Sequence, residues 1–177
     1  RCKAVRDSRA SGASNGNGDG QIGATTESFQ FWYQLASAKL IEGSYTGVTG
    51  AVAGGKDSVI GTNCPETKLK GTGFAINFLG IISGGSDTAF FDGNYGHVLY
   101  YGAYQSGLQP LSAAITASEA YNIDKKIDDG LPVSGNILAQ KTTGWTTSCT
   151  TGTTSAATYV ASSASTKRCA LIIVTGF

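Results

Sequence analysis

The side chains in this sequence best suited to chemistry are oxygen donors that alternate near its N-terminus. Asn15, Asn17 and Asp19 occupy every second position, and Gly20 and Ile22 follow where a calcium-binding loop turns and packs. Oxygen donors at this spacing, completed by a main-chain carbonyl and a closing acid, coordinate Ca²⁺ in EF-hand loops. The pattern predicts a calcium site with five ligand residues: Asn15, Asn17, Asp19, Gln21 through its carbonyl, and Glu27.

This stretch departs from the calcium pattern at two positions. The first position holds Asn15 where aspartate is usual, and the twelfth holds Thr26, so the closing acid Glu27 stands one residue late. Asp7 is an additional candidate ligand. The alternative interpretation is a turn rich in glycine and asparagine that binds no ion. The sequence leaves both interpretations open.

The remaining acids and the single histidine do not form a recognisable catalytic set. Asp124, Asp128 and Asp129 have helical spacing, but lysines lie between them. This favours a solvated helix face or a subunit contact over a catalytic pair of carboxylates. His97 is the only histidine, and the chain has no Gly-x-Ser-x-Gly nucleophile turn. We therefore expect no enzymatic activity.

Aromatic residues are frequent between positions 90 and 104. Because side chains alternate between the two faces of a strand, some of these rings should point outward. They would then form a glycan-binding or adhesive surface. The alternative is that the rings cover the first helix or are buried between neighbouring subunits. The residues concerned are Phe90, Phe91, Tyr95, Tyr100, Tyr101 and Tyr104.

The four cysteines favour disulfide bonds. Their number is even, and they include no Cys-x-x-Cys pair of the kind common in zinc sites, with only one histidine to add as a ligand, so zinc is not expected. A chain poor in charge and rich in Gly, Ser and Thr fits an oxidising compartment, the periplasm or the cell exterior. Of the three pairings we expect Cys149 with Cys169, because the polar loop between them needs a covalent link, which leaves Cys2 with Cys64.

Length and charge limit the class of protein. A chain of 177 residues has the size of one domain, here taken as residues 1–177. The net charge of +1 gives no sign of a nucleic-acid-binding surface. No apolar stretch is long enough to span a bilayer as a helix. The chain begins at Arg1 and contains no methionine, so we expect a processed or truncated product.

Periodic apolar residues predict the elements of the N-terminal half. Phe29, Trp32 and Leu40 recur at helical spacing, which predicts a helix over about residues 27–42. Residues 44–72 have no steady period and are expected to be mainly loop. Segments 74–82 and 97–104 are rich in β-branched and aromatic residues and flank an Asp-Gly-Asn turn, so we expect two antiparallel strands.

The C-terminal half shows a clear helix start. Thr116 and Glu119 form a capping box, and the helix should end before Gly130 and Pro132. We expect a short strand over 136–140, a loop over 142–166 and a final strand over 169–174. The predicted fold class is α+β, with an antiparallel β-sheet packed on a helix, rich in loops and held by disulfides.

Four segments resemble, in the same order, the globular heads of bacterial prepilin-type proteins. They are the loop at 15–22, the Phe-Trp to Ser-Tyr-Thr-Gly stretch at 31–47, the Ala-Tyr-Asn-Ile-Asp-Lys-Lys-Ile-Asp-Asp-Gly-Leu-Pro stretch at 120–132, and the closing residues 169–173. The resemblance implies a type IV pilin or type II secretion pseudopilin. Such proteins display an antiparallel-sheet head outside a filament whose core consists of hydrophobic N-terminal helices.

The sequence departs from that family at its N-terminal end. It contains neither the hydrophobic helix with its prepilin-peptidase site nor the acidic residue near the mature N-terminus, so no assembly residue can be carried over. We expect that the chain begins after that helix or that a separate polypeptide supplies it.

The resemblance implies a non-catalytic structural subunit of an extracellular or periplasmic bacterial filament. Its partners would be copies of itself or related pilin subunits. The alternative function is a secreted, calcium-dependent adhesive or glycan-binding module.

Overall fold

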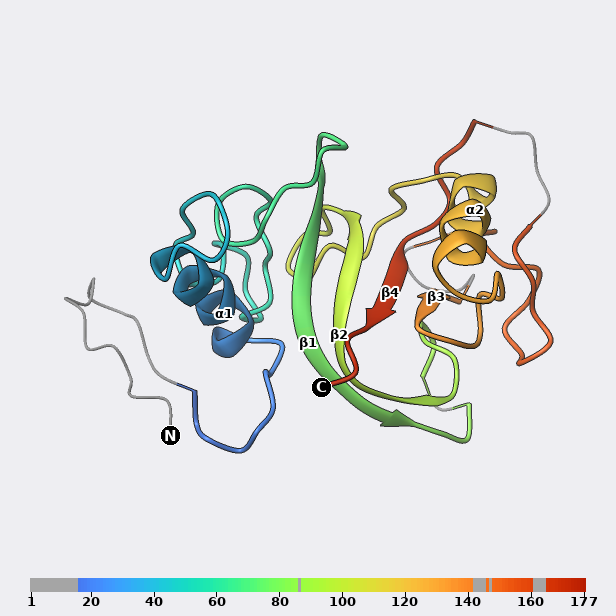
Figure 1. Ribbon diagram of the computed structural model, residues 1–177, viewed down its shortest axis with the longest axis horizontal. Helices are drawn as coiled ribbons and strands as arrows, with labels where there is room; N and C mark the ends of the chain where they lie inside the picture. The colour runs from blue at the N-terminus through green and yellow to red at the C-terminus, as the bar shows by residue number, and fades with distance from the viewer. Residues whose placement is uncertain (1–15, 86, 142–145, 147, 161–164) are drawn as a thin grey trace.

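Two helices and four strands make up the described part of the chain (Figure 1). The computed structural model describes residues 16–85, 87–141, 146, 148–160 and 165–177. The strands form one antiparallel sheet in the order β1-β2-β4-β3, which confirms the predicted α+β class. Within these residues, neither helix has the length and apolar character that crossing a membrane requires. The elements are α1 (Thr26–Ser37), β1 (Thr72–Ile82), β2 (Gly93–Ala103), α2 (Ala117–Ile127), β3 (Ile137–Ala139) and β4 (Leu171–Val174).

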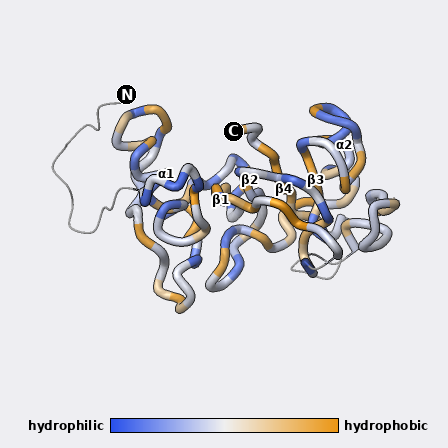
Figure 2. The backbone as a smooth tube through the Cα atoms, turned by 90° about the horizontal axis from the view of Figure 1, so that it is seen from below, coloured by the Kyte–Doolittle hydropathy of each residue, from blue (hydrophilic) through white to orange (hydrophobic). Residues whose placement is uncertain are grey.

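Both faces of the sheet are buried, because apolar residues occupy successive positions on the central strands. In β4, Leu171 points to the face that α2 covers, whereas Ile172 points to the opposite face. There Ile172 packs with Val98 and Tyr100 of β2 and with Phe90 of the β1–β2 connection. Figure 2 shows β4 as an apolar segment and much of α2 as hydrophilic. The connections therefore form one of the layers around the sheet.

The two helices lie at opposite ends of the sheet (Figure 1). α1 packs on β1, where Trp32 contacts Ile76 and the Ser28 hydroxyl donates a hydrogen bond of 2.7 Å to the Ile76 carbonyl. α2 packs on β3, where Ala120 and Ile137 belong to one apolar cluster. Each end of the molecule thus presents the outer side of one helix and its flanking loops.

The first helix ends earlier than the sequence predicted. α1 stops at Ser37, and Lys39 adopts a left-handed conformation with φ of 59°. Main-chain bonds from Lys39 to Ala36 and from Leu40 to Leu35 close the helix, both at 2.9 Å. The prediction of a helix to residue 42 with Leu40 on its buried face was wrong, because the chain reverses at Lys39 and leaves Leu40 72% exposed.

The other elements agree more closely with the prediction. α2 begins with the predicted capping box of Thr116 and Glu119, and β1, β3 and β4 fall within or next to their predicted ranges. The prediction of a turn at residues 92–94 was wrong: β2 begins at Gly93 and pairs with Ile82. The pairing of β1 with β2 shifts register at Gly80 and then continues to Ile82, so the strands are longer than their apolar pattern suggested.

The predicted bond between Cys149 and Cys169 is present. Both sulfurs are fully buried in the cluster that contains Ile115 and Tyr159, so the bond fastens the segment around residue 149 to the chain that leads into β4. Cys64 is a buried free thiol, and burial raises its pKa to about 12. Its predicted partner, Cys2, lies outside the described residues.

We predict that reducing the bond between Cys149 and Cys169 lowers the free energy of unfolding by roughly 3 kcal/mol, because a closed loop of about 20 residues restricts the unfolded chain. Denaturant unfolding with and without reductant measures the difference.

The control is the double variant Cys149→Ser, Cys169→Ser, which should unfold at the midpoint of the reduced wild type and should not respond to reductant. A wild type that is equally stable in both conditions would contradict the prediction.

Candidate functional site

The predicted calcium loop leads into the N-terminus of α1, and its oxygen donors hold one another. The Asn17 amide donates to the Asp19 carboxylate at 2.8 Å, and the Asp19 main-chain N–H donates to Asn17 Oδ1 at 3.0 Å. The Gln21 N–H donates to the same carboxylate at 2.7 Å. These bonds lower the pKa of Asp19, that from Gln21 most strongly, and favour its charged form.

Glu27 closes this loop from the first turn of α1. Its two carboxylate oxygens accept hydrogen bonds from the main-chain N–H groups of Asn17, at 2.9 Å, and Gly23, at 3.0 Å. Glu27 therefore contacts the loop even though it stands one residue after the usual position of the closing acid. Gly20 has φ of 79°, as expected at the sharp turn of a calcium loop.

The structure brings three of the predicted ligand residues together: Asn17, Asp19 and Glu27. Gln21 follows in the same turn, whereas Asn15 and the additional candidate Asp7 lie outside the described residues. Carboxylates that already accept N–H bonds keep further lone pairs, so the donor set fits a hard cation that prefers oxygen. Calcium binding stays a prediction.

His97 fixes the other end of the loop to the sheet. Its Nε2 accepts a 3.0 Å hydrogen bond from the Ile22 N–H, and its Nδ1 lies 2.9 Å from the Phe177 carbonyl. Nδ1 therefore carries the proton. The Phe78 N–H also donates to the Ile22 carbonyl at 2.7 Å, so the loop lies hydrogen-bonded along the edge of β1. Both nitrogens of His97 engage main-chain groups in this arrangement.

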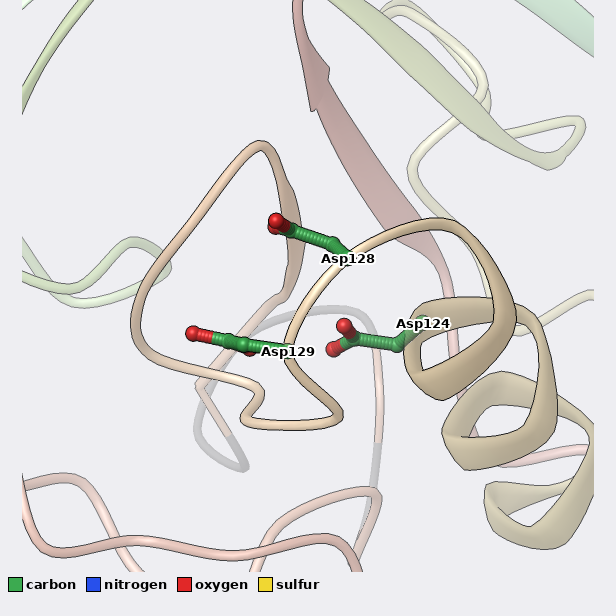
Figure 3. Close-up of side chains that lie close together, drawn as sticks. All are labelled: Asp124, Asp128 and Asp129. Atoms are coloured by element: carbon green, nitrogen blue, oxygen red, sulfur yellow. The ribbon is translucent and has the colours of Figure 1, made fainter.

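A second acidic group lies where α2 ends (Figure 3). Ligand oxygens of Asp124, Asp128 and Asp129 lie within 4.8 Å of one another, the only such group of potential metal ligands found among the described residues. Asp128 accepts N–H bonds from Asn136 and Ile137, the latter at 3.1 Å. Carboxylates this close can hold a cation, but exposed acidic groups are common without one.

Asp124 and Asp129 complete the same set of bonds. Asp129 accepts from the Leu131 N–H and the Ser134 hydroxyl, both at 2.7 Å. Asp124 accepts from the Gly130 N–H at 2.9 Å and from the Tyr159 hydroxyl at 2.7 Å. The three acids thus fasten the connection from α2 to β3.

The placement of Asp124 corrects the sequence interpretation. This side chain was expected on the solvated face of the helix with its neighbours, but it is fully buried beside Tyr159. Burial is the main cause that raises the pKa of Asp124, and the nearby charges of Asp129 and Asp128 add to it. Tyr159 lies 35 residues further along the chain, so spacing within the helix carried no sign of this contact.

Asp57 is an acid that the sequence did not single out. Its carboxylate accepts hydrogen bonds from the Tyr104 hydroxyl at 2.9 Å, the Gly107 N–H at 3.1 Å and the Val52 N–H at 3.2 Å. Burial raises the pKa of Asp57, but these three bonds outweigh it and hold the pKa below its ordinary value. Asp57 therefore joins the long loop after α1 to the end of β2.

The aromatic residues expected to form an adhesive surface are mostly in the core. Phe90, Phe91, Tyr95 and Tyr100 are buried, and Tyr104, which is 44% exposed, donates its hydroxyl to Asp57. Phe90 and Tyr100 stack at 5.7 Å between ring centroids on the face of the sheet away from the helices. These four rings are therefore buried within the chain itself, neither over the first helix nor between subunits, the two arrangements that the sequence left open.

Comparisons with known proteins give no relative. No protein-family model, curated protein or solved structure matches this chain.

We predict that calcium stabilises the folded chain through the loop closed by Glu27, and that Asp19→Ala removes this effect. Binding to the folded state alone should raise the free energy of unfolding by about 2.7 kcal/mol at a calcium concentration of about 100 times Kd. Thermal unfolding in calcium and in chelator measures it. The matched control is Glu42→Ala, which removes an exposed acid elsewhere and should leave the response intact. Equal melting temperatures of wild type and Asp19→Ala in both media would contradict the site.

We predict a pH dependence from Asp124. Its pKa is raised above 3.8 in the folded state, so its contribution to stability is complete below that value and is lost as the pH rises through the folded-state pKa. The stability of the wild type relative to Asp124→Asn should therefore fall as the pH rises from below 3.8 through the higher folded-state pKa. Denaturant unfolding across this range measures the difference.

A second variant sharpens this test. The Tyr159 hydroxyl bond favours the ionised carboxylate, so Tyr159→Phe should extend the pH-dependent fall to higher pH. A stability difference between wild type and Asp124→Asn that does not vary with pH would show that Asp124 ionises equally well in the folded and unfolded chains.

Proposed function

We propose that the chain is a non-catalytic structural subunit of an extracellular or periplasmic pilus-like filament, a type IV pilus or a type II secretion pseudopilus. The observation that carries this proposal is the ordered resemblance of four segments to prepilin-type heads. In the structure these segments are the loop before α1, α1 with its exit, α2 with its acidic connection, and β4. They therefore belong to the elements that define the fold.

The arrangement of the elements supports the proposal. Among the described residues a helix comes first and packs on an edge strand of an antiparallel sheet, and residues 16–25, which lead into it, contact the sheet through Ile22 (Figure 1). A hydrophobic helix attached there, or supplied by a separate polypeptide, would leave the sheet and α2 on the outside. The partners are then copies of this chain or related subunits.

The surface also supports association with other subunits. Large apolar side chains are well exposed at separate places, among them Leu40, Ile81 and Ile127, each at 67% or more. Single exposed apolar residues are normal on soluble proteins, and contacts of this size would be weak in isolation. Filament cohesion would come from the hydrophobic N-terminal helices in the filament core. Contacts between heads would set the spacing of subunits.

We predict that electron microscopy of the native assembly shows helical filaments that contain this chain. Isolated heads should be monomers or weak oligomers in analytical ultracentrifugation. Lys126→Glu, a change on the exposed face of α2, should alter filament stability against shear or heat without changing the unfolding midpoint of the head.

A protein found only as a free monomer with a saturable small-molecule or glycan ligand would contradict this function. It would favour the alternative of a secreted binding module.

A further inference from the structure

A groove runs along α2 on the end of the molecule away from α1. It has a volume of about 520 Å³ and lies between the first turns of α2, the residues just after the helix and segment 158–160. Tyr121, Leu131, Tyr159 and Val160 supply its apolar lining. Tyr121 is 38% exposed and Leu131 is 45% exposed. A concave apolar site of this kind accepts one branched apolar side chain as an anchor.

Two exposed lysines lie on the face of α2 that borders this groove. The Lys125 ammonium lies 5.4 Å from the centroid of the Tyr121 ring, and Lys126 is exposed beside it. Neither lysine pairs with an acid among the described residues. The three neighbouring aspartates direct their carboxylates to N–H and hydroxyl donors of the loop after α2 and of Tyr159. An acidic group on an incoming partner would therefore complement the rim.

The opposite end of the same molecule carries an apolar side chain next to an acid. Leu40 is 72% exposed, and Glu42, two residues later, is exposed as well. The chain turns at Lys39 and leaves Leu40 exposed. The φ of Lys39 is 59°, which is uncommon for a residue other than glycine. Main-chain hydrogen bonds from Lys39 to Ala36 and from Leu40 to Leu35, both at 2.9 Å, hold this conformation at the end of α1. We name residues 39–42 the α1 corner.

Glu42 differs from the other acids of the described chain in its hydrogen bonding. Every other aspartate and glutamate there accepts at least one main-chain N–H bond, whereas the Glu42 carboxylate has no hydrogen-bond partner in that part of the chain. The acids that accept such bonds are Asp19, Glu27, Asp57, Glu66, Asp87, Asp92, Glu119, Asp124, Asp128 and Asp129. Glu42 thus keeps its charge available for a partner.

We propose that the α1 corner of one copy docks into the α2 groove of the next copy, with Leu40 as the anchor and Glu42 beside Lys125. This contact deepens the proposed filament function and rests on it. The two surfaces lie at opposite ends of the sheet (Figure 1), so the contact is heterologous and repeats from subunit to subunit. Heterologous contacts build open helical assemblies where the rotation between neighbouring subunits does not close a ring.

The test uses native filaments that carry substitutions in this chain, with the pelleted fraction as the readout. Leu40→Ser should reduce the assembled fraction by about tenfold, as truncation of an anchor does. Glu42→Lys and Lys125→Glu should each reduce it by about threefold, as loss of a surface ion pair followed by repulsion does. The charge-swapped double variant should return the assembled fraction to within about twofold of the wild type.

Ile81→Ser is the matched control, because Ile81 is 73% exposed but lies outside both surfaces, and it should assemble normally. A photo-reactive benzoyl-phenylalanine in place of Leu40 should cross-link to a peptide that contains Tyr121 or Leu131 of another copy. Unfolding midpoints of the variant heads should match the wild type, since all the changed side chains are exposed.

The outcomes separate this contact from the filament function. Suppose that the wild type forms filaments but the charge-swapped double variant does not recover assembly. That result would overturn the contact and leave the filament function standing. A cross-link to another surface or to a different protein would do the same. A wild-type protein that forms no filaments would overturn both. Rescue together with the cross-link to α2 would establish the contact.

Discussion

Carboxylates that accept hydrogen bonds from main-chain N–H groups hold this structure together. More than half of the chain lies in connections outside its helices and strands, and buried N–H groups in such segments need acceptors. Asp57 supplies them between the first long loop and the end of β2, Glu27 supplies them in the loop before α1, and Asp128 supplies them after α2. Bonds to a charged acceptor are stronger than bonds between neutral groups, so a few acids can fix long loops.

This use of acids explains both the low charge and the perturbed pKa values. The acids do not serve as a solvating shell, because most of them turn toward the chain. Where N–H bonds dominate, as at Asp57, the pKa falls; where burial and neighbouring carboxylates dominate, as at Asp124, it rises. The two groups therefore respond to pH in opposite directions, and the net slope depends on their balance.

The sequence predicted the elements whose cause is local. The apolar periods of β1 and α2 and the capping box at Thr116 lie within a few residues, so their positions could be read from spacing. The closing acid of the candidate calcium loop, Glu27, could also be identified from its spacing, because it lies only ten residues after Asn17, from whose N–H it accepts a hydrogen bond. The contacts that sequence reasoning missed join distant residues: Asp57 with Gly107, and Asp124 with Tyr159. An aspartate in a helix has the same local pattern whether it faces water or a tyrosine from another segment.

The end of α1 shows how a local pattern can mislead and still matter. Leu40 continues the apolar period of the helix, yet Lys39 turns the chain and exposes it. Glycine would adopt the same turn at lower conformational cost, and nothing in the packing of the described residues buries Leu40 in return. Main-chain bonds from Lys39 to Ala36 and from Leu40 to Leu35 offset that cost within the chain, so the turn ends the helix and leaves Leu40 exposed. The neighbouring Glu42 is exposed and its carboxylate has no hydrogen-bond partner among the described residues, so an apolar side chain and an available charge lie side by side, the two groups that the proposed contact between copies would use.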